Sequence, residues 1–244
     1  MALIEWESAM ATPPNMHPLD NVIWQALTTR QAEFAEIFDE ARRFPHEVTS
    51  LAAFVEPGPR GYASLASLLS PGESVTLSLT AQYQPLPGWE LVASGPGLQM
   101  VCEDGRTGSD YQMNGGTEVT ALGLSDSAEM VELATLTKPG PFGPRTHELG
   151  TYLGIRCGEK LVAMAGERLK VPGYTEVSAV CTHPEHTGKG YARILMTEII
   201  RRIRERDETA FLHVRQNNTR AVELYERLGF RKRMIVQFTV LRKT

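Results

Sequence analysis

The chain has 244 residues, of which 42% are hydrophobic and 22% are charged. This ordinary globular composition excludes a wholly disordered chain, and the length fits one large domain or two small ones. No apolar run is long enough to cross a membrane, and the first residues lack the pattern of a secretory signal. The net charge of −4 gives no general attraction to nucleic acid or to a membrane surface.

The three cysteines are Cys102, Cys157 and Cys181. They form neither a CxxC pair nor the spacing of a zinc site, so we expect no metal. Few and widely spaced cysteines indicate buried free thiols in a reducing, cytoplasmic setting.

A polar, glycine-rich stretch over 105–116 separates two regions of different character. It predicts a division near residue 113, with an N-terminal α/β accessory domain over 1–113 and a second domain over 114–244. In the first part, apolar residues from Val22 to Ala41 predict one helix. Strands are predicted over 74–79 and 89–92, each preceded by a Pro-Gly pair.

The second part shows a clear succession of elements. A strand is predicted over 117–122. A helix is predicted to follow it, because Asp126 with Glu129 three residues later resembles a capping box at a helix N-terminus. Apolar periodicity then predicts strands at 151–156, 160–167 and 175–182, a helix at 192–203, a strand at 211–215, a helix from 218 and a strand at 234–240. Gly229 is predicted to end the last helix. The order is β-α-β-β-β-α-β-α-β.

The turn over 187–190 joins the third of those neighbouring strands to a helix. Because the first amides of a helix lack internal partners and glycines allow close approach, this turn can hold a phosphate. It is not a P-loop, because no Ser or Thr follows Lys189, and its place after several strands does not fit a dinucleotide fold.

Two stretches of the chain together resemble a known family. Residues 180–192 read VCTHPEHTGKGYA, and residues 218–230 read NTRAVELYERLGF. They are similar to the R/Q-x-x-G-x-G/A turn and the N-x-x-A-x-x-L-Y-x-x-L-G-F helix of the GNAT acetyltransferases. The resemblance covers about residues 117–244 and is strongest to the FR47-like and glycine-acyltransferase-like branch. It implies an α/β (α+β) fold with a central mixed, mostly antiparallel sheet flanked by helices. The N-terminal half would be an additional α/β unit, compatible with a degenerate copy of that fold.

The resemblance implies that acetyl-CoA is the co-substrate. The strand before the turn would pair with the pantetheine amides through the backbone of Val180, Cys181 and Thr182. The turn would hold the pyrophosphate, through Thr187, Gly188, Lys189, Gly190, Tyr191 and Ala192. Asn218 would bind the cofactor, serve as a helix N-cap, or do both. Thr187 stands where the family has Arg or Gln, so weaker cofactor contacts are expected.

The resemblance also implies catalytic roles. Tyr225 matches the tyrosine that protonates the departing thiolate, and Glu176 occupies the strand position where some relatives have a general base. Glu167, His213 or a relayed water are alternative bases. Period two places Glu176 on one strand face with Ser178, Val180 and Thr182. Cys181 could in principle carry an acyl group, but a buried thiol is the favoured interpretation, which predicts direct transfer in a ternary complex.

The predicted activity is transfer of an acetyl group to a primary amine of a small molecule or peptide. Phe142, Arg145 and His147, in a proline- and glycine-rich loop, are expected to border the acceptor. Neither nucleic acid nor membrane is an expected partner, and a homodimer is compatible with the resemblance. The alternatives are a CoA-binding regulatory or scaffold protein without turnover, which Thr187 keeps open, and nucleotide binding by the glycine turn alone.

Overall fold

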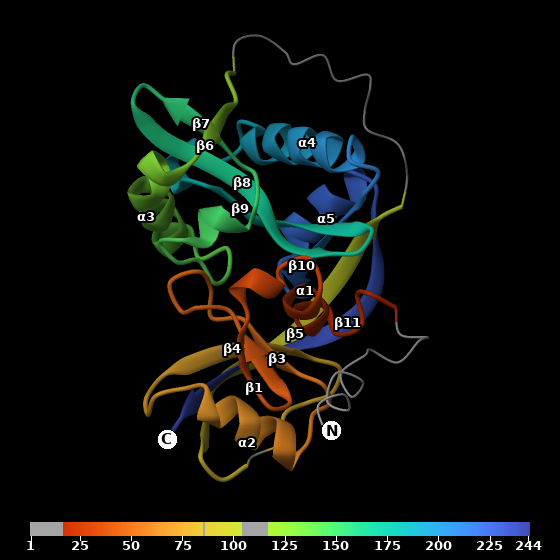
Figure 1. Cartoon of the computed structure of the whole chain (residues 1–244). Coiled ribbons are helices and arrows are strands. Elements are labelled where there is room, and N and C mark those ends of the chain that lie inside the picture. The colour runs from red at the N-terminus through yellow and green to blue at the C-terminus, as the bar shows by residue number, and fades with distance from the viewer. Residues whose placement is uncertain (1–16, 85, 104–116) are drawn as a thin grey trace, which may run out of the picture.

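The computed structural model describes residues 17–84, 86–103 and 117–244. Its main feature is an eight-stranded sheet with the order β4-β11-β5-β10-β9-β8-β7-β6 (Figure 1). The strands are β4 (Ser74–Leu79), β5 (Trp89–Cys102), β6 (Thr120–Leu122), β7 (Tyr152–Cys157), β8 (Lys160–Val171), β9 (Tyr174–Thr182), β10 (Thr209–Arg215) and β11 (Phe230–Lys243). Neighbouring strands are antiparallel except β9 and β10, which are parallel.

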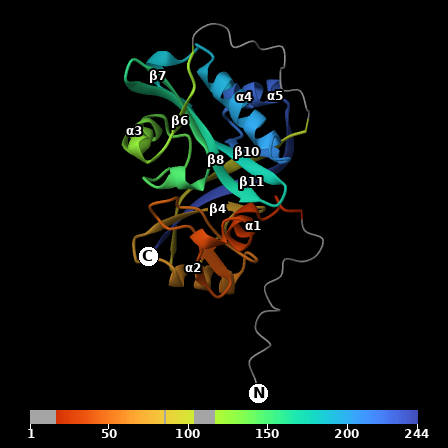
Figure 2. The same cartoon turned by 45° about the horizontal axis from the view of Figure 1, so that its top comes forward.

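Helices cover both faces of this sheet (Figure 2). On one face lie α4 (Tyr191–Arg204) and α5 (Thr219–Arg227), whose apolar side chains share a core with Val177 and Leu212. On the other face, α1 (Val22–Thr28) packs in a core with Phe211, and α3 (Ser127–Thr137) packs against Tyr152. Short 3-10 helices occur at Ala32–Phe34, Leu124–Asp126, Thr146–Leu149 and Pro184–His186.

The N-terminal region differs from its predicted form. The expected helix from Val22 to Ala41 is wrong: α1 ends at Thr28, and a hairpin of β1 (Glu36–Phe38) and β2 (Ala41–Arg43) follows. The Thr28 hydroxyl donates to the Trp24 carbonyl, 2.8 Å away, and such side-chain bonds compete with helix continuation. With β3 (Ala52–Phe54) the hairpin forms a three-stranded sheet, beside which lies α2 (Pro59–Ser67).

The predicted division at residue 113 falls in the range 104–116, outside the described residues. The main sheet continues across it, because β4 and β5 come from the first part of the chain and pair with β11, while β5 also pairs with β10. The two parts of the chain therefore share the main sheet, while the three-stranded sheet comes from the first part alone. The division into two domains stays a prediction.

The predicted succession of elements in the second part is confirmed from β6 to β11. The capping box at the start of α3 is wrong, since the Asp126 carboxylate accepts from the Gly123 amide at 2.9 Å and pairs with Arg156 at 2.6 Å. The thiols are free as expected, but Cys157 is exposed at the end of β7, whereas Cys102 and Cys181 are buried.

Candidate active site

The site opens where the parallel strands β9 and β10 separate. They pair only where Tyr174–Glu176 lies beside Thr209–Phe211, and both strands then continue without pairing to each other. A cleft of about 430 Å³, called here the β9–β10 cleft, is lined by the end of β9, by the turn into α4 and by α5, which follows β10. Its lining includes ten residues predicted for the site: Val180, Cys181, Thr182, Thr187, Gly188, Gly190, Tyr191, Ala192, Asn218 and Tyr225. Loss of pairing leaves strand-edge groups available to an extended ligand.

A bulge in β9 sets which side chains face the cleft. Gly166 of β8 pairs with Ser178 and Met164 pairs with Cys181, so β9 has one residue more than β8 in this interval. Ala179 takes up the extra residue with φ of 53°. As a result Val177 and Val180 both pack on the α4 side. The expectation that period two keeps Glu176 and Val180 on one face is therefore wrong.

The turn before α4 has the backbone of an anion site. Gly188 and Gly190 have φ of 82° and 80°, a conformation that glycine adopts at little cost. The first α4 amide with a helical partner is that of Ile194, which donates to the Gly190 carbonyl at 3.1 Å. The amides just before it point out of the helix N-terminus, where the dipole is positive. No described atom lies within 4 Å of a side chain built at either glycine, so the turn has room for a phosphate.

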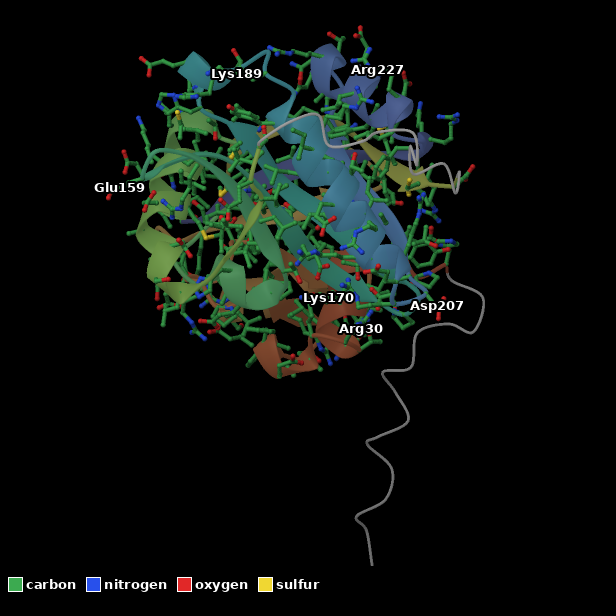
Figure 3. All side chains as sticks on the ribbon, turned by 90° about the horizontal axis from the view of Figure 1, so that it is seen from above. Arg30, Glu159, Lys170, Lys189, Asp207 and Arg227 are labelled. Carbon is green, nitrogen blue, oxygen red and sulfur yellow. The ribbon has the colours of Figure 1, made fainter. Side chains whose placement is uncertain are left out.

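Basic side chains surround the mouth of the cleft. Lys189 is not part of the lining, and its Nζ lies 3.4 Å from His186 Nδ1. The lining includes Arg193, Arg220 and Arg227, which the sequence analysis missed. Arg220 and Arg227 are seven residues apart on α5, and this helical repeat is the signal that could have found them. Lys189 and Arg227 lie at the same edge of the molecule (Figure 3).

Tyr225 reaches the cleft from α5 and packs near Phe230, with 6.1 Å between ring centroids. Burial raises the pKa of Tyr225 to about 12, so its hydroxyl stays protonated at neutral pH. Asn218, the residue immediately before α5, uses its side-chain oxygen as an N-cap for the Ala221 amide at 3.3 Å. Asn218 also lines the cleft, so capping and ligand contact are geometrically compatible.

Glu176 is fully buried and does not line the cleft. Arg168 donates two hydrogen bonds to the Glu176 carboxylate, from Nε at 2.9 Å and from Nη2 at 2.8 Å. His213 Nδ1 lies 2.7 Å from Oε1 of the same carboxylate. Burial disfavours the ionised carboxylate of Glu176 and would raise its pKa. The Arg168 guanidinium has the larger, opposite effect and lowers the pKa of Glu176 to about 2. A carboxylate with such a low pKa is a weak proton acceptor.

The other predicted bases are also engaged. His213 Nε2 lies 3.2 Å from the Gln99 amide nitrogen, while the Gln99 oxygen accepts from Arg233 at 2.8 Å. This assigns the proton of His213 to Nδ1, facing Glu176, so both ring nitrogens have partners. Glu167 is buried and pairs with Arg206 at 2.7 Å and Lys170 at 3.3 Å.

Comparisons with known proteins show the family of the chain. The family model for FR47-like proteins matches residues 152–239. A solved GNAT-family protein from Novosphingobium aromaticivorans is 35% identical, with a TM-score of 0.83 over 94% of this chain and 100% of its own. The chain belongs to the GNAT family. A GCN5-related N-acetyltransferase from Kribbella flavida, at 17% identity, covers 91% of this chain and 93% of its own with a TM-score of 0.58, and shows the fold alone. No curated protein matches the chain.

The loop expected to border the acceptor in this GNAT-family protein is packed on the α3 side. Phe142 meets Tyr152 edge-on, with 5.8 Å between ring centroids. Arg145 pairs with Glu148 at 2.8 Å, and His147 Nδ1 lies 3.1 Å from the Pro144 carbonyl. None of the three lines the β9–β10 cleft, so their part in acceptor binding stays a prediction.

Two negative findings apply to residues 17–84, 86–103 and 117–244. Within them, no group of three or more His, Cys, Asp or Glu residues is placed to hold a metal ion. The helices found there are all too short or too polar to cross a membrane.

The Glu176 ion pair gives a testable expectation. Glu176→Gln leaves the buried Arg168 guanidinium without its counter-charge, so the free energy of unfolding should fall by on the order of 2 kcal/mol at pH 7. Because the folded-state pKa is depressed, the carboxylate stabilises the fold above pH 4.5, and this stabilisation is lost as pH falls toward 2. The variant should therefore lose less stability over that pH range, as measured by urea unfolding.

Glu198→Gln is the matched control, because Glu198 also has a pKa lowered to about 2, mainly by hydrogen bonding to Arg201 on α4. Its carboxylate is one-quarter exposed, so a much smaller loss of stability is expected. If Glu176→Gln instead keeps full stability but removes a rising limb of the pH–rate profile, Glu176 is the general base.

Proposed function

We propose that this protein is an N-acetyltransferase that transfers the acetyl group of acetyl-CoA to a primary amine of a small molecule or peptide. The observation that carries the proposal is the opening between β9 and β10, which leads to the free amides at the start of α4. A long ligand with amides at one end and phosphates at the other fits such a path.

The chain offers each part of that ligand a partner. Backbone groups within Val180 to Thr182, on the edge of β9 that does not pair with β10, would bind the pantetheine amides as an added strand does. The amides of Gly188 to Ala192 would bind the pyrophosphate, with Lys189 and Arg227 supplying positive charge nearby. Asn218 would contact the cofactor from the start of α5.

Direct transfer is supported by the state of Cys181. Burial raises the pKa of this thiol to about 11, so it is a poor nucleophile at neutral pH. The neutral amine of the acceptor then attacks the thioester carbonyl itself, a C–N bond forms and the C–S bond breaks. Tyr225, protonated at neutral pH, gives its proton to the thiolate of CoA.

The proton released by the amine needs an acceptor. Glu176 was the predicted base, and its pairing with Arg168 favours the rival role of a buried structural carboxylate. With His213 held between Glu176 and Gln99, a relayed water is the remaining predicted route. The Glu176→Gln and Glu198→Gln comparison decides between these roles.

The test is acetyl-CoA binding by calorimetry together with thiol release in a panel of primary amines. Binding with acceptor-dependent thiol release is the expected result. The second candidate, a CoA-binding protein without turnover, is favoured by Thr187, which replaces a long side-chain donor in the turn. Tight CoA binding with no thiol release for any amine would support it, and preference for ATP over CoA would reject both.

A further inference from the structure

Thr187 stands in the glycine turn where the family pattern has Arg or Gln, and its own hydroxyl is already engaged. Thr187 Oγ1 donates to the Pro184 carbonyl at 3.0 Å, within the 3-10 turn that precedes it. A hydroxyl has one hydrogen to donate, so Thr187 offers none to a ligand. A side-chain donor to a phosphate at this point of the cleft has to come from a neighbouring residue.

His186, the preceding residue, has such a donor. It is half-buried and lines the β9–β10 cleft beside Thr187 and Gly188. Lys189 Nζ lies 3.4 Å from His186 Nδ1, and an ammonium group only donates, so Nδ1 is the acceptor and the ring proton is assigned to Nε2. In the part of the chain that the structure describes, His186 Nε2 makes no hydrogen bond, which leaves this N–H for a ligand in the cleft.

The cleft that His186 faces is lined by groups that can carry positive charge. Three arginines line it together with His186, and no Asp or Glu is among the described residues of the lining. The other titratable side chains there are two tyrosines and Cys181, and burial raises the pKa of Cys181 to about 11. His186 is therefore the lining residue of the type that changes its charge near neutral pH.

Three more basic side chains, Lys160, His183 and Lys189, form the His–Lys cluster with His186. Lys160 Nζ lies 3.3 Å from His183 Nε2, and the rings of His183 and His186 meet edge-on with 5.8 Å between their centroids. Glu185 approaches this cluster, with 3.9 Å between its carboxylate and His183 Nδ1, but its side chain is 80% exposed. Four basic groups beside one exposed carboxylate favour the binding of an anion.

The acidic side chains of α3 lie on the other side of the cluster. Glu129 and Glu132 border a separate small pocket together with Lys160 and His183, and neither glutamate lines the β9–β10 cleft. The Glu129 carboxylate also accepts from Arg156 Nη1 at 3.0 Å. The positive charge that His186 and Lys189 present to the cleft is therefore not neutralised from α3.

Protonation of His186 is coupled to the binding of an anion. Burial, followed by the electrostatic effects of Lys189 and His183, lowers the pKa of His186 in the free protein. A phosphate beside Nε2 has the opposite effect, because it favours the imidazolium. The imidazolium has a hydrogen on both nitrogens, so the Lys189 ammonium loses its acceptor at Nδ1 and is released to contact the phosphate as well.

We propose that His186, assisted by Lys189, binds a phosphate group of the cofactor in place of the donor that Thr187 lacks, and that protonation of His186 tightens this binding. Cofactor affinity then rises as the pH falls through the pKa of His186 in the complex, and it levels off below the pKa of the free protein. The inference rests on the proposed function, because the ligand is the CoA moiety in the same cleft. The pyrophosphate and the 3′-phosphate of CoA offer the same oxygen chemistry, and the test separates them.

The test measures the Kd of CoA and of dephospho-CoA by calorimetry between pH 8 and pH 5.5, for the wild type and for His186→Gln. Dephospho-CoA lacks the 3′-phosphate, whose second ionisation falls in this range. The wild-type Kd should fall by about 5- to 10-fold toward pH 5.5, on the scale of a neutral hydrogen bond becoming a charged one. His186→Gln keeps an N–H donor that cannot be protonated, so its Kd should stay nearly constant and match the wild type within about 3-fold at pH 8.

The two ligands identify the phosphate that is bound. A pH effect that His186→Gln removes for both ligands assigns the pyrophosphate, and one that it removes for CoA alone assigns the 3′-phosphate. His46→Gln is the matched control, because His46 is exposed in the N-terminal region and does not line the cleft, so it should keep the wild-type pH dependence. The same pH dependence in the wild type and in His186→Gln would overturn the proposal, as would its loss in His183→Gln alone.

Failure of the proposed function is seen separately. The binding measurements need no turnover, so a CoA-binding protein that releases no thiol still tests the role of His186. If the wild type binds neither CoA nor dephospho-CoA, the proposed function fails, and an NMR titration of the histidine rings with and without sulfate tests the cluster alone. A higher pKa of His186 in sulfate would support an anion site there, and an unchanged one would reject it.

Discussion

Gly190→Asp is expected to reduce acetyl-CoA affinity by 100-fold or more. The substitution places a carboxylate at the N-terminal turn of α4, where an added Cβ meets open space and where we propose that the phosphates bind. Two unit charges 4 Å apart repel by about 4 kcal/mol at an effective dielectric constant of 20, which corresponds to roughly a thousand-fold in affinity. Isothermal titration calorimetry measures the change.

Backbone strain must be separated from charge in this experiment. Gly158 has a similar positive φ of 61° and open surroundings, but it lies in the β7–β8 hairpin away from the cleft. Gly158→Asp should show a similar loss of stability, about 1–2 kcal/mol, with unchanged cofactor affinity. Gly190→Asn, similar in size and neutral, should bind more tightly than Gly190→Asp. Wild-type affinity in Gly190→Asp would reject the phosphate site.

Tyr225→Phe is expected to lower kcat by on the order of 100-fold, the usual contribution of a positioned general acid. The ring and its packing near Phe230 are retained, so the melting temperature should change little. Because the pKa of Tyr225 is raised to about 12, the hydroxyl is protonated throughout the neutral range and can donate to the thiolate. Turnover at saturating acetyl-CoA and amine measures the effect.

Tyr62→Phe is a control with matched chemistry. Burial raises the pKa of Tyr62 to about 12 as well, but this residue packs against Phe54 in the N-terminal core. It should leave kcat unchanged. Unchanged kcat in Tyr225→Phe as well would mean that Tyr225 only packs in the core of α4 and α5.

Local sequence patterns were sufficient to predict most helices and strands of the second part of the chain. The apolar repeat of α4 and the Asn218 cap with Gly229 after α5 use signals within a few residues, and both helices form where predicted. In the N-terminal region the same kind of pattern gave a wrong prediction, since Phe34, Ile37 and Phe38 have helical spacing but do not lie on one helix. Ile37 and Phe38 are instead about half exposed in the β1–β2 hairpin.

The family and the fold class were determined by the sequence alone, because short motifs fix the strand–turn–helix around the glycine turn. Phosphate binding by the free amides of that turn stays a prediction. The tertiary structure decided the rest. Pairing between strands far apart in the chain brought β5 beside β10, and the bulge at Ala179 turned Val180 toward the cleft. The ion pair of Glu176 with Arg168 depends on packing across β8 and β9, and its low pKa follows from that burial and contact rather than from any local pattern.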